Sequence, residues 1–174
     1  AALAQDIYIA RGGRETIHPR FTYHGYRLLE ITGIDRPLPL ESVKGVVLSS
    51  IHQLASHYDT SNAKVNKLWK NITWSSYGNF VSIPTDCPQR NERLGWMGDI
   101  SVFSRTATYL ADVPQFLRRY LRSARDSQHA DGRFPDVAPL GIGFGGLLWG
   151  SAGITVPWEC YQQYGHEALY LLYS

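Results

Sequence analysis

Hydrophobic residues near the beginning of this chain of 174 residues fall in short segments rich in aromatic and β-branched side chains. Two such segments run from Arg20 to Ile34 and from Val43 to His52, and the stretch DRPLPLES, with two prolines, lies between them. This pattern is typical of β-strands separated by a loop. Because so few strands cannot close a sandwich, we expect them to be the end of a β domain that begins upstream.

From about residue 60 the hydrophobic period changes to that of an amphipathic helix. In TSNAKVNKLWKNITWSSYGNF, apolar residues recur at i, i+3, i+4 and i+7, Thr60 or Ser61 can cap the start, and Gly78 can end the helix. The recurring positions are Val65, Leu68, Trp69 and Ile72.

Two further helices are predicted, from about Ile100 to Leu110 and from about Val113 to Ser127. Asp112 as a cap, followed by Pro114 near the first helical position, indicates a tight turn between them. The second of these helices has one apolar face, formed by Phe116, Leu117, Tyr120, Leu121 and Ala124.

The stretch from Asp131 to Gly153 is rich in glycine and proline and long for a loop, and such loops are usually functional or disordered. After it, Thr155 or Val156 can cap a helix that ends at Gly165. The apolar segment from Leu169 to Tyr173 resembles a helix cut in mid-course, which suggests a fragment.

Helices joined by a tight turn and followed by a long loop predict paired antiparallel helices with functional loops at one end.

Composition narrows the class of partner. The formal charge of +2 gives no basic field for nucleic acid or an anionic membrane, and no apolar run approaches the ~18 residues of a membrane span. Cys87 and Cys160 are far apart and form no CxxC pattern, so we expect buried free thiols and no metal site. No secretion signal is visible at the start, and compartment and oligomeric state stay open. Aromatic residues make up 13% of the chain, which favours carbohydrate chemistry only where carboxylates lie nearby.

The stretch TDCPQRNERLGWMGD, Thr85 to Asp99, places such carboxylates beside arginines and a tryptophan. Taken singly, Asp86 can form a capping box with Gln89, Asp99 can cap the next helix, and Glu92 can form an exposed ion pair. Together the acids match what glycosidic cleavage needs: one protonated acid for the leaving oxygen and carboxylates for water and hydroxyls. Burial in a water-poor cleft and neighbouring acids would raise the pKa of such an acid.

The longer motif PTDCPQRNERLGWMGD resembles the signature of the α-L-rhamnosidases of glycoside hydrolase family 78, and PRFTYHGYRLLEITG and WGSAGITVPWECYQQYG resemble flanking parts of the same enzymes. The resemblance implies a mainly α fold in which residues 56–174 begin an (α/α)6 toroid. Residues 1–55 would be the last strands of a β-sandwich domain and a linker. It also implies inverting hydrolysis of terminal, non-reducing α-L-rhamnosyl groups, with no cofactor and no metal, acting on rhamnose-containing glycosides or polysaccharides.

By position in the motif, Glu92 corresponds to the general acid. The substrate-binding residues implied in the same way are Asp86, Arg90, Trp96, Asp99 and Trp149. Phe134 and Asp136 are weaker candidates for the pocket, and Trp158 is expected in a helix core.

The sequence departs from the family pattern at Asn91 and Ser151, where an acid is usual, and the loss of a like charge at Asn91 is expected to lower the pKa of Glu92. The resemblance implies a general base beyond Ser174; Glu159 is a poor substitute and Glu167 a poorer one. We therefore expect the chain alone to be nearly inactive and to associate or remain partly molten. A noncatalytic sugar-binding remnant and a toroidal glycosidase for another sugar remain as alternatives.

Overall fold

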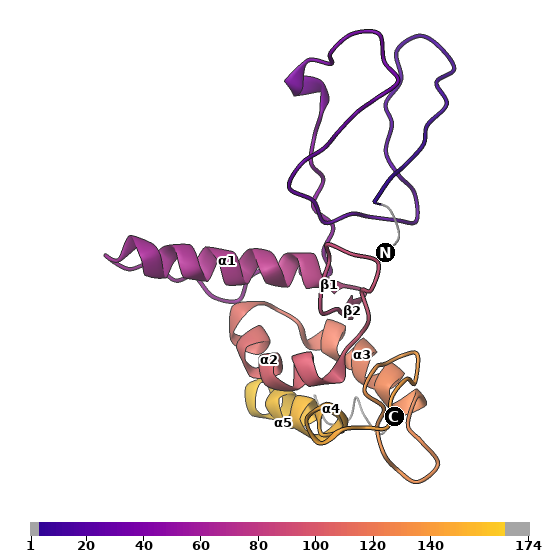
Figure 1. The fold of residues 1–174 in the computed structure, drawn as a ribbon. Helices are drawn as coiled ribbons and strands as arrows, with labels where there is room; N and C mark the ends of the chain where they lie inside the picture. Colours follow the sequence, from indigo (N-terminus) through magenta and orange to yellow (C-terminus); the bar gives the residue numbers. More distant parts are fainter. Residues whose placement is uncertain (1–3, 166–174) are drawn as a thin grey trace.

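The computed structural model describes residues 4–165, and its regular structure is almost entirely helical (Figure 1). Its elements are a 3₁₀ turn (Leu40–Ser42), α1 (Ala63–Asn79), β1 (Phe80–Val81), β2 (Ile83–Pro84), α2 (Met97–Leu110), α3 (Pro114–Asp126), α4 (Leu147–Gly150) and α5 (Ala152–Tyr164). The two short strands pair as an antiparallel hairpin directly after α1. No described helix is both long and apolar enough to cross a membrane.

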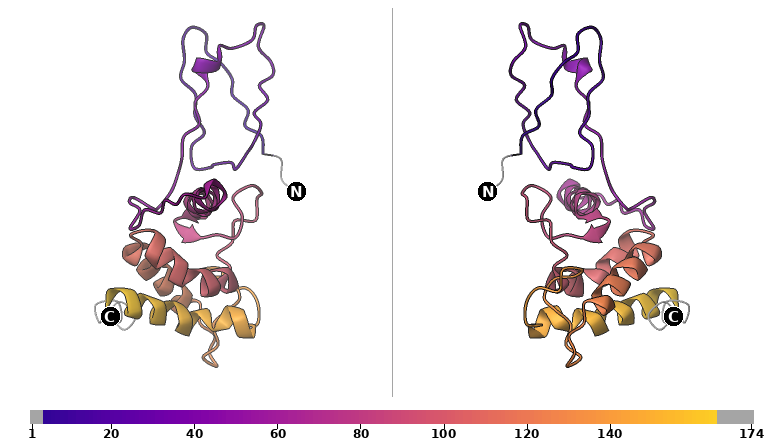
Figure 2. Two further views of the ribbon diagram at one scale, coloured as in Figure 1. Left: turned by 90° about the vertical axis from the view of Figure 1, so that its left-hand side faces the viewer. Right: turned by 90° about the vertical axis from the view of Figure 1, so that its right-hand side faces the viewer.

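The part before α1 is extended but forms no regular strand between residues 4 and 53, in contrast to the sequence prediction. Figures 1 and 2 show it as wide, open loops that lead away from the helices. A strand requires a ladder of backbone hydrogen bonds, whereas the described bonds of these segments to later residues are isolated: the amide of Gly25 donates to the carbonyl of Pro88 at 3.2 Å and that of Ser50 to Phe80 at 2.6 Å. Apolar side chains are therefore exposed here, such as Ile9 (85%) and Leu28 (90%).

Helix α1 begins one residue later than the predicted caps allow. Asn62 is its N-cap, and the side-chain Oδ1 accepts hydrogen bonds from the backbone amides of Lys64 (3.0 Å) and Val65 (3.4 Å). Gly78 lies inside the helix, which ends at Asn79.

The apolar stripe predicted for α1 is not its buried face. Leu68 is 58% exposed, whereas Thr73 and Ser76 are buried. Their hydroxyls donate to the carbonyls of Trp69 and Ile72 in the preceding turn, so these polar side chains need no other partner to be buried. Within the predicted stripe Val65 and Leu68 are exposed, whereas Trp69 and Ile72 are partly buried.

Helices α2 and α3 are joined by a short turn, residues 111–113. The predicted apolar face of α3 is confirmed, since Phe116, Leu117, Tyr120, Leu121 and Ala124 are all buried. Pro114 occupies the first turn of α3, but its N-cap is Val113 and Asp112 makes no capping bond. Helix α2 starts at Met97, before the predicted Ile100, with Trp96 as its N-cap.

Helix α5 also begins earlier than predicted, at Ala152, and Pro157 lies inside the helix. It ends as expected at Gly165, whose φ of 76° suits glycine. Trp158 is 53% exposed, so its placement in a helix core was wrong: it lies on the face of α5 opposite the buried Val156 and Cys160. The apolar segment from Leu169 to Tyr173 lies outside the described residues.

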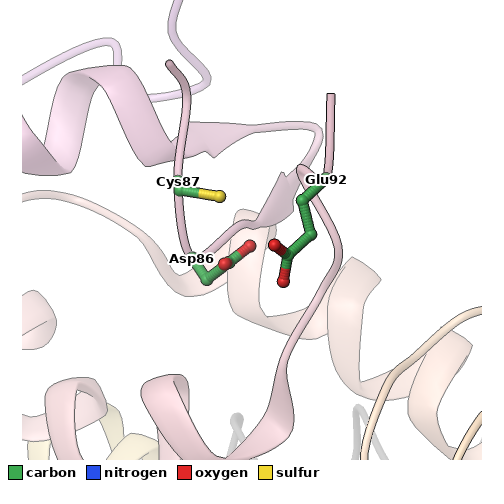
Figure 3. Close-up of side chains that lie close together, drawn as sticks. All are labelled: Asp86, Cys87 and Glu92. Carbon is green, nitrogen blue, oxygen red and sulfur yellow. The ribbon is translucent and has the colours of Figure 1, made fainter. Parts of the chain in front are cut away.

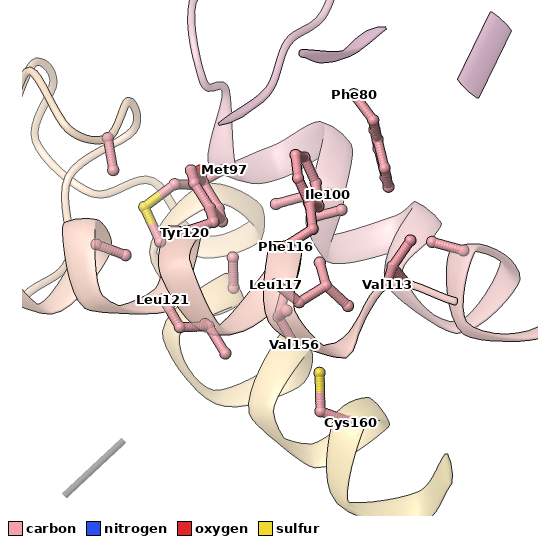
Figure 4. Packing of buried hydrophobic residues seen from close by; sticks show 14 of the residues in the cluster. Phe80, Met97, Ile100, Val113, Phe116, Leu117, Tyr120, Leu121, Val156 and Cys160 are labelled. Atoms are coloured by element: carbon pink, nitrogen blue, oxygen red, sulfur yellow. The ribbon is translucent and has the colours of Figure 1, made fainter. Parts of the chain in front are cut away.

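The core forms where α2, α3 and α5 meet (Figure 4). Met97, Leu117, Tyr120 and Val156 are fully buried within it. Both cysteines are free and buried, as predicted, and burial raises the pKa of Cys160 to about 12. The packing of these helices fixes the loops before α2 and before α5, which carry the candidate site residues.

Candidate active site

The charged motif forms an irregular loop between β2 and α2. Its entrance is tied to the end of α1, because the backbone amide and the hydroxyl of Thr85 both donate to the carbonyl of Asn79, at 2.9 and 3.0 Å. Its exit is tied to the core, because the buried hydroxyl of Tyr120 donates to the carbonyl of Gly95 at 3.0 Å. No helix begins at Asp86, so the capping box predicted there with Gln89 is wrong.

Glu92 lies at the centre of this loop and both of its carboxylate oxygens are bound. Arg90 donates to Oε2 from Nε at 2.8 Å and from Nη2 at 2.7 Å, and the indole N–H of Trp96 donates to Oε1 at 2.8 Å. The side chain of Glu92 remains 31% exposed. It is therefore a positioned carboxylate that a ligand could still reach.

Asp86 faces the same carboxylate (Figure 3). Its Oδ2 lies 3.5 Å from Nη2 of Arg90, and its Oδ1 is buried without a hydrogen-bond partner among the described residues. One ligand atom each from Asp86, Cys87 and Glu92 lies within 4.8 Å of the others, a spacing that a metal ion could bridge. The donor set fits a metal poorly, because Glu92 is already bound on both oxygens and burial, followed by hydrogen bonding to Asp86, raises the pKa of the Cys87 thiol.

The pKa values of Glu92 and Asp99, the acids on either side of Trp96 in the sequence, are shifted in opposite directions. Hydrogen bonds from Arg90 and then from Trp96 hold the pKa of Glu92 below its usual value, which is the opposite of the rise that the sequence suggested. The pKa of Asp99 is raised, chiefly because the surrounding protein removes part of its hydration and then because of the charges on Asp86 and Glu92. The free site thus favours an ionised Glu92.

Asp99 does not cap α2 but occupies its first turn, two residues after Met97. Trp149, from the short helix α4, reaches the same turn: a Cβ on Gly98 would lie only 2.9 Å from Cε2 and Nε1 of its indole. Gly98 is therefore required for the close approach of this ring, and Trp149 and Asp99 are brought to the same end of α2. The motif and the α4 turn therefore meet at the start of α2.

Sequence reasoning missed the link between this loop and the part before α1. Arg93, at a φ of 47°, donates to the carbonyl of Tyr23 at 2.7 Å and stacks its guanidinium 4.5 Å from the centre of the Tyr23 ring. It also donates to Oδ1 of Asn91 at 2.8 Å, so the asparagine that departs from the family pattern is engaged in holding the loop. No local pattern joins two residues so far apart in sequence.

The acid considered as a substitute base is engaged elsewhere. Glu159 lies on α5 and pairs with Nε of Arg105 at 2.8 Å, and it makes no described contact with Glu92. Glu167 is outside the described residues. Ser151, the second departure from the family pattern, donates its hydroxyl to the carbonyl of Leu148 at 3.0 Å.

Comparison with known families gives two matches that together span most of the chain. Residues 53–171 match the family model described as the bacterial alpha-L-rhamnosidase 6 hairpin glycosidase domain, and residues 1–49 match the bacterial alpha-L-rhamnosidase concanavalin-like domain. With the observed helices, the first match confirms the predicted mainly helical fold, the start of an (α/α)6 toroid.

Similar proteins carry the same description. An alpha-L-rhamnosidase of Streptomyces avermitilis is 48% identical over 168 residues, which is 95% of this chain but 16% of that protein. An alpha-L-rhamnosidase of Alteromonas sp. is 41% identical over 175 residues, covering 97% of this chain and 19% of that protein. The chain thus spans less than a fifth of the length of these relatives.

Solved structures of similar proteins include alpha-L-rhamnosidase from Dictyoglumus thermophilum, with a TM-score of 0.73 and 39% identity over 79% of this chain and 16% of that chain. The Streptomyces avermitilis enzyme, solved in complex with L-rhamnose, has a TM-score of 0.59 and 46% identity over 67% of this chain and 12% of its own. The enzyme from Aspergillus terreus has a TM-score of 0.70 and 43% identity over 80% of this chain and 16% of its own.

Proposed function

Because the chain belongs to the bacterial α-L-rhamnosidase family with a six-hairpin glycosidase domain, we propose that it supplies the acid side of an active site that hydrolyses terminal, non-reducing α-L-rhamnosyl residues. The observation that carries this proposal is the position of Glu92, held by Arg90 and Trp96 and faced by Asp86. A proton donor must be fixed in direction and remain accessible to the glycosidic oxygen, and this carboxylate meets both conditions.

In the proposed reaction the protonated carboxyl of Glu92 gives its proton to the glycosidic oxygen while the bond from that oxygen to the anomeric carbon breaks. A carboxylate on the opposite face of the sugar takes a proton from water, and the resulting hydroxyl attacks the anomeric carbon with inversion. We assign no described residue to this base: Glu159, the acid weighed for it, is paired with Arg105. From the family resemblance, we propose that the base lies beyond the described residues.

An ionised Glu92 in the free site must gain a proton before it can act. Arg90, whose hydrogen bonds are the largest cause of the lowered pKa, is 54% exposed and can turn towards a sugar hydroxyl. A bound sugar would also remove water from the carboxyl, which favours its neutral form. Substrate binding would thus raise the pKa of Glu92 where the proton is needed.

The surrounding side chains would bind the sugar ring. Asp86 and Asp99 offer carboxylate oxygens to hydroxyl groups, and Trp96 and Trp149 offer aromatic faces. Rhamnose is a 6-deoxy sugar whose methyl group gains about 0.8 kcal/mol on apolar burial, which fits a pocket with two tryptophans. Rhamnose-containing glycosides or polysaccharides are the substrates we expect.

The direct test is Glu92→Gln in the full-length gene product, assayed on an aryl α-L-rhamnoside with a good leaving group and on a disaccharide with a poor one. Loss of a general acid should lower kcat/KM by about 10²–10⁴-fold for the poor leaving group and by less for the good one. Glu159→Gln is the matched control and should leave both rates near those of the unaltered protein, because its carboxylate pairs with Arg105 away from Glu92. If Glu92→Gln keeps the kcat/KM of the unaltered protein on both substrates, the assignment is refuted.

The stereochemical course can be followed separately by proton NMR of the first product. Inversion releases β-L-rhamnose first, and mutarotation then produces the α anomer. Initial formation of α-L-rhamnose would contradict the inverting mechanism without affecting the assignment of the sugar. Hydrolysis of an aryl glucoside at a similar rate would instead favour a different sugar.

A further inference from the structure

In the loop after α3, Asp136 contacts both the start of α2 and the start of the α4 turn. Its backbone carbonyl accepts a hydrogen bond from the amide of Met97, the first residue of α2, at 2.8 Å. Its side-chain Oδ1 accepts a hydrogen bond from the amide of Gly146, the N-cap of α4, at 2.7 Å. One residue therefore contacts the start of the helix that carries Asp99 and the start of the turn that carries Trp149.

The neighbours of Asp136 strengthen this connection. Val137 forms an isolated β-bridge with Trp96, and the amide of Ala138 donates to the carbonyl of Gly95 at 3.1 Å. Residues 136–138 thus lie alongside the end of the motif loop. The strand-like pairing holds the backbone of residue 136 in place, which leaves its side chain free to orient the α4 turn.

The carboxylate of Asp136 is enclosed by glycines of that turn. A Cβ on Gly143, whose φ is +92°, would overlap the Asp136 carboxylate, so the Gly143 backbone lies against this side chain as closely as glycine allows. Gly146 is buried, and a Cβ there would lie 3.2 Å from Cε3 of Trp149. The turn from Gly143 to Trp149 is therefore folded around the Asp136 side chain, with the indole packed next to the hydrogen-bonded amide.

We propose that Asp136 is a positioning residue: its carboxylate sets the place of Trp149 in the pocket and does not itself bind the sugar. The sugar part of this inference rests on the proposed function. Glycine-rich turns have many backbone conformations available, and one hydrogen bond at the N-cap selects the conformation that places the indole against Gly98. The position of the ring, and with it the affinity for the substrate, depends on this bond.

Two variants separate the role of Asp136 as a hydrogen-bond acceptor from the effect of its negative charge. Asparagine keeps an oxygen that can accept from the Gly146 amide, whereas alanine removes it. In the full-length protein, Asp136→Ala should lower kcat/KM for an aryl α-L-rhamnoside by about 10–100-fold, mainly through KM, as expected for a ring displaced by about 1 Å. Asp136→Asn should restore activity to within about threefold, since only the charge of the acceptor is lost. Asp126→Ala, at the exposed end of α3, is the matched control and should have no effect.

Two measurements report on the turn without any turnover. Hydrogen exchange at residues 143–149 should become faster in Asp136→Ala and stay unchanged in Asp136→Asn. The indole N–H resonance of Trp149, assigned by its loss in Trp149→Phe, should move only in the alanine variant. These results would support the inference even if the protein failed to hydrolyse rhamnosides, which would refute the proposed function alone.

Two outcomes would overturn the inference. If Asp136→Asn loses as much activity as Asp136→Ala while exchange and the indole resonance stay unchanged, the carboxylate acts on the substrate directly. If neither variant changes KM, exchange or the indole resonance, the hydrogen bond to Gly146 does not determine the position of Trp149.

Discussion

Gly98 offers the sharpest steric test of the pocket. A Cβ at this position would lie 2.9 Å from Cε2 and Nε1 and 3.0 Å from Cδ1 of Trp149. Carbon atoms in good contact are about 3.5–4.0 Å apart, so Gly98→Ala requires the ring to retreat by roughly 0.6–1.1 Å. Trp149 is 37% exposed, and it can make that movement towards solvent without disturbing the core.

The effect on folding should have the opposite sign to the effect on function. Alanine is favoured over glycine in a helix interior by up to about 1 kcal/mol, so the substitution in the first turn of α2 should not weaken the fold. Displacement of a pocket wall by about 1 Å can lower activity by up to about 10²-fold. We therefore expect Gly98→Ala to lower kcat/KM for an aryl α-L-rhamnoside by about 10–100-fold, mostly through KM, at unchanged or increased stability.

A second glycine provides the matched control. Gly78 lies within α1, and a Cβ there would be 3.5 Å from Cγ and 3.9 Å from Cβ of Pro88, which are ordinary contacts. Gly78→Ala gains the same helix propensity without a clash, and its activity should stay within about twofold. The assays are steady-state kinetics, calorimetric binding of L-rhamnose and urea unfolding on both variants. Equal KM and equal L-rhamnose affinity in the two variants would refute the placement of Trp149 as a pocket wall against Gly98.

Two further predictions concern the motif loop. Trp96→Phe removes the indole N–H that stabilises the ionised carboxylate of Glu92, so the pKa of Glu92 should rise. The alkaline limb of the pH profile of kcat/KM should then move to higher pH. If this limb stays in place or moves to lower pH, Glu92 is not the acid. Tyr120→Phe removes the buried hydrogen bond to the carbonyl of Gly95, which keeps its bond from Ala138, so the free energy of unfolding should fall by only about 0.5–1.5 kcal/mol. A loss of several kcal/mol in urea unfolding would show that the hydroxyl does more than bond to this carbonyl.

The helices could be predicted from sequence where local signals decide them. Helix α3 has a continuous apolar stripe and a proline at its first position, and both agree with the structure. The starts of α2 and α5 were misplaced because neither helix has a side-chain cap. The first amide of α2 is satisfied instead by the carbonyl of Asp136, from a loop that follows α3. A cap supplied by tertiary structure leaves no local sequence signal.

The candidate site could likewise be predicted from sequence only in part. Asp86, Arg90, Glu92 and Trp96 lie within one short motif, so their proximity could be expected, but the irregular loop that sets their contacts could not. The approach of Trp149 to Gly98 depends on how a long glycine-rich loop folds around Asp136, and composition could only mark that loop as functional. The exposure of Val65 and Leu68 on α1 could not be predicted, because periodicity identifies an apolar face without saying what covers it.

The opposite pKa directions of Glu92 and Asp99 bear on which carboxyl donates the proton. In the free site partial loss of hydration raises the pKa of Asp99 above its usual value, whereas hydrogen bonds from Arg90 lower that of Glu92, so Asp99 takes up a proton more readily than Glu92. A donor, however, must be neutral in the complex and not in the free protein. The chief cause of the lowered pKa of Glu92 is an exposed arginine that a sugar can engage, so this cause can be removed on binding, which favours Glu92 as the donor. The comparison of good and poor leaving groups therefore discriminates between the two acids. If kcat/KM falls more strongly from the good to the poor leaving group in Asp99→Asn than in Glu92→Gln, Asp99 is the acid.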